Sequence, residues 1–332
     1  ESMLLLAAVL TIASAPALVR PSSAIAPVAA RLPRVHIVAS SAVETAGNVA
    51  AAAGRLPVDR YIATNNFNVR PGCEAKFEAR WANRKSRLAT LNGFRYFNLM
   101  RRVKLDDDSP EYDDDFGYTS FTIWNDKPAF DEWRSGEAFK EAHGGTSIGA
   151  FLGAMISSLR VLKGPPRPIF YDGLLHLSTK PAELPPTEGG WRVVEADGES
   201  LLPAEAFVAC NKFSVLPGQE SAFEQRWAQR ESKLAELPGF VSFTMLRRDF
   251  GTKGHGGGGG SDEACNYMSA TVWKDKEAFL NWRSSQQFRT THGGGSGGEQ
   301  AAAASKPPPM WAGPPKPTFY EAVLVLSSPE GA

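Results

Sequence analysis

The chain has 332 residues, which is enough for two domains of ordinary size. Its 36 basic and 36 acidic residues cancel, so no net field recruits nucleic acid or an anionic membrane surface. The three cysteines, Cys73, Cys210 and Cys265, form neither a CxxC pair nor an even set, which argues against a disulfide framework and a zinc ribbon. We therefore expect a reducing compartment and no nucleic acid partner.

Residues 1–55 differ in composition from the rest of the chain. They are rich in Ala, Ser and Val and hold four arginines, but only Glu1 and Glu44 as acids. The apolar run from Met3 to Ile12 is too short to span a bilayer and has no basic flank before it. We expect no membrane span and interpret this stretch as a transit segment for a plastid (chloroplast), with a mitochondrial presequence as second choice and a secretory signal as third.

The rest of the chain is an internal repeat. An offset of 146 residues aligns strand and helix residues of the first copy with the second, and a loop insertion changes this offset to 149. Matches at the first offset include Asn65 with Asn211 and Trp81 with Trp227. Chance does not explain so many coincidences, so we expect one domain written twice.

In the first copy, residues 61–69 alternate as a strand and are followed by a helix that Asn92-Gly93 should end. Two strands are expected at 94–103 and 116–124, joined by a polar hairpin loop at 106–115, whose acid run Asp106–Asp108 we interpret as solvated. Asp126 can cap a second helix that runs to His143, and a last strand follows at 168–178. The order βαββαβ predicts a ferredoxin-like α+β domain.

The predicted domains are residues 56–178 and 206–328. Residues 179–205 between them are rich in Pro, Glu and Gly, which favours a surface linker rather than a packed element. Two helices on one face of a four-stranded sheet leave the other face uncovered, and the second copy can cover it. We expect an intramolecular pseudo-dimeric α+β barrel that is monomeric as a chain.

Asn65 and Asn211 are the first candidate site residues. Each lies on a strand face with apolar neighbours, among them Phe67 and Phe213. An amide on an apolar face needs a hydrogen-bonding partner or a ligand. The alternative is a core Asn satisfied by the backbone.

His143 and His292 end the second helix of each copy, ahead of glycines, and Trp133 and Trp282 lie ten residues earlier, roughly 15 Å along a continuous helix. A neutral imidazole beside a glycine-rich loop can ligate a metal, whereas the simpler role is a cap at the negative end of the helix dipole. The tryptophans could line one flat ligand, or could serve only as packing anchors of the helices.

Taken together, the segments 63–72 (ATNNFNVRPG) and 122–143 (TIWNDKPAFDEWRSGEAFKEAH) resemble the antibiotic biosynthesis monooxygenase superfamily. More narrowly, they are similar to its IsdG-type haem-degrading branch. The Asn, Trp and His that this branch uses match Asn65, Trp133 and His143 in the first copy, and Asn211, Trp282 and His292 in the second.

The resemblance implies that His143 and His292 are axial ligands of haem iron. The asparagines would donate a hydrogen bond to iron-bound oxygen, and the tryptophans would distort the porphyrin. Phe67 and Phe213 are assigned to haem binding. Haem would be both substrate and cofactor, opened by molecular oxygen with release of iron. An external electron donor, such as ferredoxin or an NADPH-linked reductase, would be required.

Two other functions stay open. A cofactor-independent monooxygenase of the same superfamily would act on an aromatic or quinol substrate. A non-catalytic protein would bind haem as a carrier or sensor, or would keep the barrel only for protein interaction. The loops after the two histidines differ, and the apolar run 148–156 in the first copy leads us to expect the better apolar wall there.

Overall fold

The computed structural model describes residues 54–109, 112, 114, 116–142, 158–230, 232–252, 265–285, 288 and 309–332. Nearly all of the expected transit segment lies outside these ranges, as do His143, His292 and the apolar run 148–156. Within the described ranges, no helix has both the length and the apolar character needed to cross a membrane.

The first repeat contains the following elements among its described residues. In chain order they are β1 (Arg60–Phe67), α2 (Glu74–Ala82), η1 (Leu88–Thr90), β2 (Phe94–Val103), β3 (Tyr118–Trp124), α3 (Lys127–Ser135), α4 (Glu137–Ala142) and β4 (Arg167–Ser178). As expected, Asp126 caps α3 by accepting a hydrogen bond from the backbone N–H of Ala129 at 2.9 Å.

The second repeat follows the same plan after two short strands, β5 (Thr187–Glu188) and β6 (Trp191–Arg192). Its described elements are β7 (Ala206–Phe213), α6 (Glu220–Ala228), η2 (Leu234–Glu236), β8 (Phe240–Arg248), β9 (Tyr267–Trp273), α7 (Lys276–Ser284) and β10 (Lys316–Ser327). Asp275 caps α7 as Asp126 caps α3, at 2.8 Å from the backbone N–H of Ala278.

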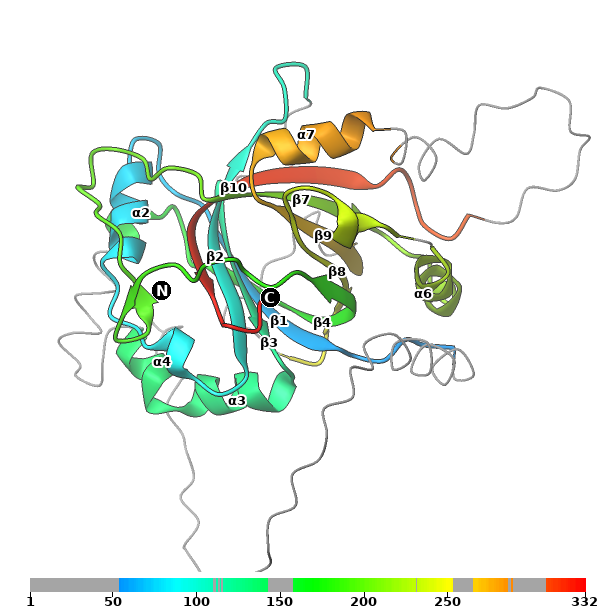
Figure 1. Cartoon of the computed structure of the whole chain (residues 1–332), viewed down its shortest axis with the longest axis horizontal. Helices are drawn as coiled ribbons and strands as arrows, with labels where there is room; N and C mark the ends of the chain where they lie inside the picture. Colours follow the sequence, from blue (N-terminus) through cyan, green and yellow to red (C-terminus); the bar gives the residue numbers. More distant parts are fainter. Residues whose placement is uncertain are drawn as a thin grey trace, which may run out of the picture. The chain divides into compact units, whose positions relative to one another are not determined.

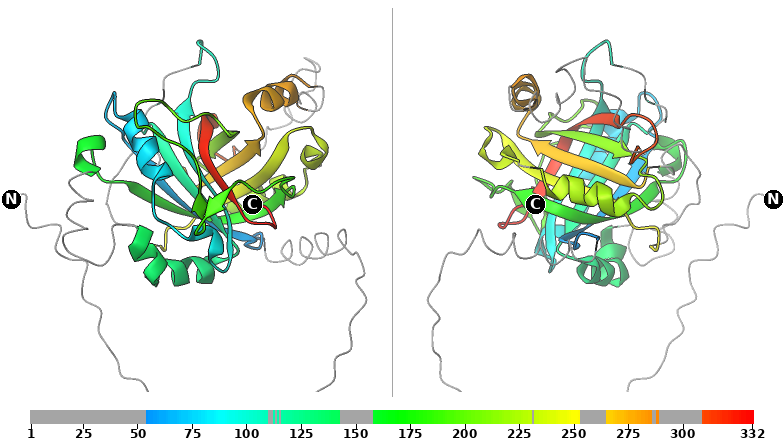
Figure 2. Two further views of the ribbon diagram at one scale, coloured as in Figure 1. Left: turned by 60° about the vertical axis from the view of Figure 1, so that its left-hand side comes forward. Right: turned by 90° about the vertical axis from the view of Figure 1, so that its right-hand side faces the viewer.

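The eight long strands close into one antiparallel barrel in the order β1-β3-β2-β10-β7-β9-β8-β4. Two ladders join the repeats. β2 pairs with β10, placing Arg102 opposite Tyr320, and β4 pairs with β8, placing Asp172 opposite Arg247. Figures 1 and 2 show the strands enclosing a common interior, with α2, α3, α6 and α7 on the outside. The expected pseudo-dimeric α+β barrel is confirmed.

Alternation along each strand divides the core into two kinds of region. On β1, Ile62 belongs to the cluster inside the barrel, whereas Tyr61, Ala63 and Phe67 pack toward the helices of their own repeat. Asn65 has the parity of the second set and is half-buried. The strand face proposed from the sequence is therefore the face that the helices cover.

Both predicted helices of the first repeat are shorter than expected. The first ends at Ala82 rather than at Asn92, and a separate 3-10 turn precedes Gly93. Gly93 has φ +75°, and a Cβ there would lie 2.5 Å from the Cβ of Ala129, so only glycine fits this entry into β2. The second helix breaks at Gly136, whose ψ of 173° is extended. Trp133 therefore does not share one continuous helix with the residues that lead to His143.

The prediction of an unpacked linker at 179–205 is wrong. Trp191 and Leu202 are buried in the helix-side core of the first repeat, and the Trp191 indole N–H donates to the carbonyl oxygen of Trp81 at 3.0 Å. Arg192 also pairs with Glu205 at 2.8 Å. Trp191 and Leu202 hold this segment against α2. Its Pro and Gly content disfavours helices and strands, but it does not prevent single apolar side chains from packing in the core.

A fully buried glutamate on α2 helps to hold the two repeats together. Glu78 accepts hydrogen bonds from the hydroxyl of Tyr118 at 2.7 Å, from the Arg101 guanidinium at 2.8 Å and from the backbone N–H of Leu202 at 2.6 Å. Arg101 also pairs with Glu321 of β10 at 2.7 Å. Leu202 belongs to the segment just before β7, which we call the arm of the second repeat. Glu78 therefore links α2 to this arm and, through Arg101, to the paired strands β2 and β10.

The second repeat has the same arrangement around Glu224. This carboxylate accepts from the Tyr267 hydroxyl at 2.6 Å, from Arg247 at 3.2 Å and from the backbone N–H of Leu56 at 2.6 Å. Arg247 pairs in turn with Asp172 of β4 at 3.0 Å. Each repeat therefore sends the arm before its first strand to the buried glutamate of the other repeat.

Candidate active site

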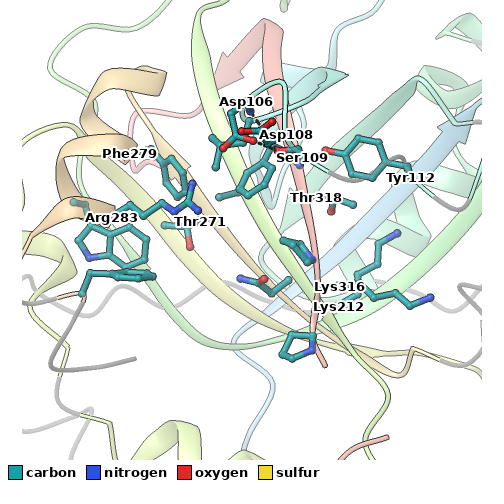
Figure 3. Close-up of a pocket in the computed structure, with 18 of the residues that line it drawn as sticks. Asp106, Asp108, Ser109, Tyr112, Lys212, Thr271, Phe279, Arg283, Lys316 and Thr318 are labelled. Atoms are coloured by element: carbon teal, nitrogen blue, oxygen red, sulfur yellow. Dashed lines mark hydrogen bonds between the residues drawn. The ribbon is translucent and has the colours of Figure 1, made fainter. Parts of the chain in front are cut away.

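A cavity of about 660 Å³ lies between α7 and the sheet of the second repeat. Strands β7, β9 and β10 form its floor, and the hairpin loop between β2 and β3 of the first repeat forms another wall (Figure 3). This volume is within the usual range for small-molecule sites, which are typically about 300–1,000 Å³. Of the sequence-predicted site residues, Asn211 and Trp282 line the cavity together.

Asn211 reaches the cavity from β7. It lies opposite Ser269 of β9 and Pro317 of β10, on the strand face shared with Ala209 and Phe213. The described residues provide no hydrogen-bond partner for its side-chain amide. A half-buried amide on the wall of a cavity, beside an apolar face, is suited to orienting a bound molecule.

Trp282 is held at the end of α7 by other aromatic rings. Its ring centroid is 5.3 Å from that of the fully buried Trp273, 5.8 Å from that of Phe279 and 4.9 Å from that of Phe288. Phe279 and Phe288 also line the cavity. Trp282 therefore both packs against the core and presents a flat apolar wall, so the two roles considered for it are compatible.

The first repeat supplies the wall that the sequence did not reveal. Leu105 is buried among second-repeat residues. The Tyr112 hydroxyl donates to the carbonyl of Val103 at 2.7 Å and accepts from the backbone N–H of Phe319 at 3.3 Å. Burial raises the pKa of Tyr112. Leu105 and Tyr112 therefore dock on the other repeat, whereas the acid run Asp106–Asp108 is exposed, as expected from the sequence.

Charged groups occupy different parts of the cavity wall. Asp106, Asp108 and Asp114 come from the first-repeat loop, and Asp114 pairs with Arg102 at 2.6 Å. Arg283 from α7, Lys212 from β7 and Lys316 from β10 contribute positive charge. Figure 3 shows the acidic loop tip on one side and the two lysines on another. None of these residues stood out in the sequence, although the apolar Leu105 and Tyr112 in an acidic loop were a usable signal for its docking.

The first repeat places Asn65 and Trp133 in equivalent positions. Trp133 lies 5.3 Å from Trp124 with a 30° interplanar angle, the same values as for Trp282 and Trp273. Phe139 contacts Trp133 at 5.0 Å, as Phe288 contacts Trp282. The frame of the site is therefore duplicated.

The segment that follows β8 contacts the first repeat through polar side chains. We call the cluster of Asp249 and Thr252 with Tyr61 and Lys127 the latch. Asp249 and Thr252 of the second repeat each lie 3.0 Å from the hydroxyl of Tyr61, and Lys127 pairs with Asp249 at 2.7 Å. Burial raises the pKa of Tyr61 to about 12. For Asp249, burial acts to raise the pKa, but hydrogen bonds from Lys127, Thr252 and Tyr61 outweigh it and hold the pKa well below its usual range.

Phe67 and Phe213, assigned to haem binding, lie deeper than the amides. Phe67 packs on Phe77 and Trp81, and Phe213 packs on Phe223 and Trp227, so both are core residues of the helix side. Neither His143 nor His292 belongs to the described residues, and within those residues no cluster of three or more His, Cys, Asp or Glu could hold a metal. The remaining described histidine, His176, is bonded to Thr244 and to the carbonyl of Ala332.

Comparisons with solved structures and with sequence profiles give the relatives of this chain. A solved structure of a proposed monooxygenase from Fusobacterium nucleatum is similar at 12% identity, covering 83% of this chain and 98% of that chain with a TM-score of 0.49. A proposed monooxygenase from Lactobacillus acidophilus is similar at 10% identity, with 82% of this chain and 98% of that chain covered and a TM-score of 0.46. An anthrone oxidase-like protein is similar at 16% identity, with 81% of this chain and 93% of that chain covered and a TM-score of 0.40. The sequence profile named "Antibiotic biosynthesis monooxygenase" matches residues 60–145 and 206–294, which is just over half of the chain and one match in each repeat. The chain therefore belongs to the antibiotic biosynthesis monooxygenase family, with two copies of its domain fused into one barrel.

Proposed function

We propose that this chain is a haem-degrading monooxygenase and that the cavity of the second repeat is its haem site. The observation that carries the proposal is the convergence of an amide, Asn211, with the aromatic walls Phe279, Trp282 and Phe288 around one 660 Å³ cavity. The chemistry of these residues fits a porphyrin, which is a flat, mostly apolar ring that needs few directed polar contacts.

His292 is the residue that we propose to ligate the iron, and it follows the cavity wall closely in the sequence. Phe288 contacts Trp282 in the cavity wall, and His292 follows four residues later. The assignment of His292 as the iron ligand comes from the resemblance to the haem-degrading branch and is part of the proposal. Bound haem would supply the iron at which oxygen is reduced, with electrons from an external donor.

The protein's own residues would position and shield the reactants. Trp282, fixed between Trp273 and Phe288, would press on one face of the ring. The Asn211 amide would donate a hydrogen bond near the reacting oxygen, and the docked loop at Leu105 and Tyr112 would exclude water. The preference for the second repeat differs from the expectation that the apolar run 148–156 favours the first, and variants of each repeat decide between them.

The test is haem binding and turnover in matched variants. Haemin should shift the Soret band on binding, and a reductant with oxygen should bleach the band and release iron even when catalase is present. Asn211→Ala should slow bleaching by about 100-fold, the usual loss for a preorganised donor, whereas Asn65→Ala should leave most of the rate. His292→Ala should weaken haemin binding more than His143→Ala.

Three outcomes would count against the proposal in different ways. No Soret shift would favour a cofactor-independent oxygenase, which should then consume oxygen with a quinol substrate alone. A stable Soret band with a competent reductase would favour a haem carrier. Loss of turnover in Asn65→Ala with full turnover in Asn211→Ala would move the reaction to the first repeat.

A further inference from the structure

An arginine near the end of α7 borders the aromatic side of the second-repeat cavity. Trp282 and Arg283 follow Phe279 by three and four residues, which are the spacings of one helix face, and all three line the cavity. Figure 3 shows the Arg283 side chain extending past Phe279 toward Thr271. Arg283 is exposed and has no ion pair among the described residues. Its guanidinium is therefore available to a ligand at the mouth of the cavity.

A hydroxyl and an amide border the cavity on the same side of the sheet. Thr271 of β9 lies directly opposite Ala209 of β7, and Asn211 follows Ala209 by two residues, so the two polar groups are diagonal neighbours on one strand face. Trp273 has the same parity as Thr271 and contacts Trp282 at 5.3 Å, so α7 covers this face. The described residues provide no hydrogen-bond partner for the Thr271 hydroxyl.

The two lysines that also border the cavity belong to the opposite face of their strands. Lys212 has the parity of Cys210, and Lys316 has the parity of Tyr320. Cys210 and Tyr320 both belong to the cluster inside the barrel. Arg283 is therefore the cation that the described residues place on the aromatic side of the cavity.

The equivalent arginine of the first repeat interacts with protein groups instead. Arg134 stacks on the ring of Phe170 at 5.8 Å, and Asp131 precedes it by three residues on α3, the spacing of a helical ion pair. At the position of Asp131 the second repeat has Leu280. Among the described residues, Arg283 stacks on no aromatic ring. An available guanidinium is therefore specific to the second repeat and does not follow from the frame that both repeats share.

Acidic groups lie on a different wall of the cavity. Asp106 accepts a hydrogen bond from the Ser109 hydroxyl at 2.7 Å, and Asp108 is exposed without an ion pair among the described residues. Figure 3 shows Asp106 and Asp108 together on the first-repeat loop, apart from Arg283. Since like charges repel and a guanidinium attracts anions, a ligand with an anionic edge should turn that edge toward α7 and away from the loop.

We propose that Arg283 and Thr271 form a subsite for a carboxylate of the cavity's ligand. The guanidinium would pair with the carboxylate through charge-assisted hydrogen bonds, and the Thr271 hydroxyl would donate another. Because Arg283 is exposed, the carboxylate would stay partly hydrated and would not bear the full cost of burial. The inference rests on the proposed function in that a porphyrin with carboxylates on one edge would be the ligand. It specifies the repeat and the wall that take this edge.

The main experiment compares protoporphyrin IX with its uncharged dimethyl ester by quenching of tryptophan fluorescence. The wild-type chain should bind the free acid about tenfold more tightly than the ester, as expected for charge-assisted bonds. Arg283→Gln should bring this preference close to one, and Thr271→Val should lower it by about two- to threefold. The affinity for the ester should change little in either variant.

Arg134→Gln is the matched control, because it removes the same side chain from the same helix position in the first repeat. It should keep the full preference for the free acid. Loss of the preference in Arg134→Gln with retention in Arg283→Gln would overturn the inference, since the carboxylate would then bind at the first repeat.

A second measurement needs no porphyrin. At equal ionic strength, sulfate should raise the thermal midpoint of the wild type and of Arg134→Gln more than that of Arg283→Gln, because only the first two keep the guanidinium beside the cavity. Porphyrin binding without ester discrimination and with equal sulfate effects would overturn the inference but leave the proposed function standing. A sulfate effect that depends on Arg283 without porphyrin binding would overturn the proposed function but leave an oxyanion subsite. Absence of both effects and of porphyrin binding would overturn both.

Discussion

The two repeats share one frame but complete their sites differently. In each, a Trp packs on a buried Trp at 5.3 Å and a buried glutamate anchors the arm of the other repeat. At the second-repeat site, however, the first repeat contributes an acidic loop with Tyr112, whereas at the first-repeat site the second repeat contributes the latch of Asp249 and Thr252.

This difference shows what fusion of the two domains allows. In a homodimer with two-fold symmetry, any change to one site appears in the other, because the same residues form both. In a single chain, the loop that crosses to the other repeat can change in one copy alone. The lysine pair at 212 and 316, replaced by Asn66 and Arg167 in the first repeat, is such a one-sided change.

The largest expected loss of stability comes from the buried glutamate that both repeats have. Glu78→Ala should lower the free energy of unfolding by about 3–5 kcal/mol, because it leaves the Tyr118 hydroxyl and the backbone N–H of Leu202 without their acceptor and leaves Arg101 with Glu321 as its remaining carboxylate. Glu224→Ala should cost a similar amount. Urea unfolding followed by circular dichroism measures both.

The milder Glu78→Gln and Glu224→Gln variants keep the side-chain volume and serve if the alanine variants do not fold. A large loss in one repeat with little change in the other would break the comparison, since the two glutamates would then not be equivalent. The hydroxyls they accept from, Tyr118 and Tyr267, have pKa values raised chiefly by burial, which is consistent with permanently protonated donors.

The next effect comes from a position where the repeats differ. His176 is bonded through Nδ1 to Thr244 and through Nε2 to the carbonyl of Ala332, both at 2.8 Å, and burial lowers its pKa from 6.5 to about 4. The second repeat has Val325 there. Because the folded state resists protonation, stability is complete above the unfolded pKa and falls as the pH drops from about 6.5 toward 4, by up to about 3 kcal/mol.

His176→Val should remove that part of the acid sensitivity. Unfolding free energies of the wild type and the variant, measured by urea titration at about pH 7 and about pH 4.5, should diverge at the higher pH and converge at the lower. If both proteins lose the same free energy on acidification, the buried imidazole is not the source of the difference.

Local patterns were sufficient to predict the frame. Alternation in β1, the cap Asp126 and the duplicated order of elements led to two ferredoxin-like domains, and the uncovered sheet faces led to the barrel. Asn211 and Trp282 were singled out through the resemblance, which depends on spacing within one repeat, and the structure places both on the wall of one cavity. Their roles remain predictions.

Features that depend on contacts between distant segments were not predicted. Docking of Leu105 and Tyr112 on the second repeat, and burial of Trp191 against α2, join residues whose proximity only the closed barrel creates. The helix break at Gly136 was missed for a different reason. One glycine lowers helix propensity by only about 1 kcal/mol, so the sequence pattern alone does not decide between one continuous helix and two short ones.

The smallest effect tests the latch on the first repeat. Tyr61→Phe gives the first repeat the residue that the second has at Phe207 and removes a hydroxyl bonded to Asp249 and Thr252. The loss should be about 1–2 kcal/mol, since Lys127 still pairs with Asp249 at 2.7 Å and its own half-exposed side chain is screened by water. Phe207→Tyr is the matched control and should give no gain in stability, because the position equivalent to Asp249 is Val103.

Asp249 has a lowered pKa in the folded state, so the latch contributes to stability above the unfolded pKa of about 3.8 and weakens as the pH falls below it. A double-mutant cycle of Tyr61→Phe with Asp249→Asn measures the coupling directly, and a coupling near zero would mean that the second-repeat loop does not depend on this contact to stay on the first repeat.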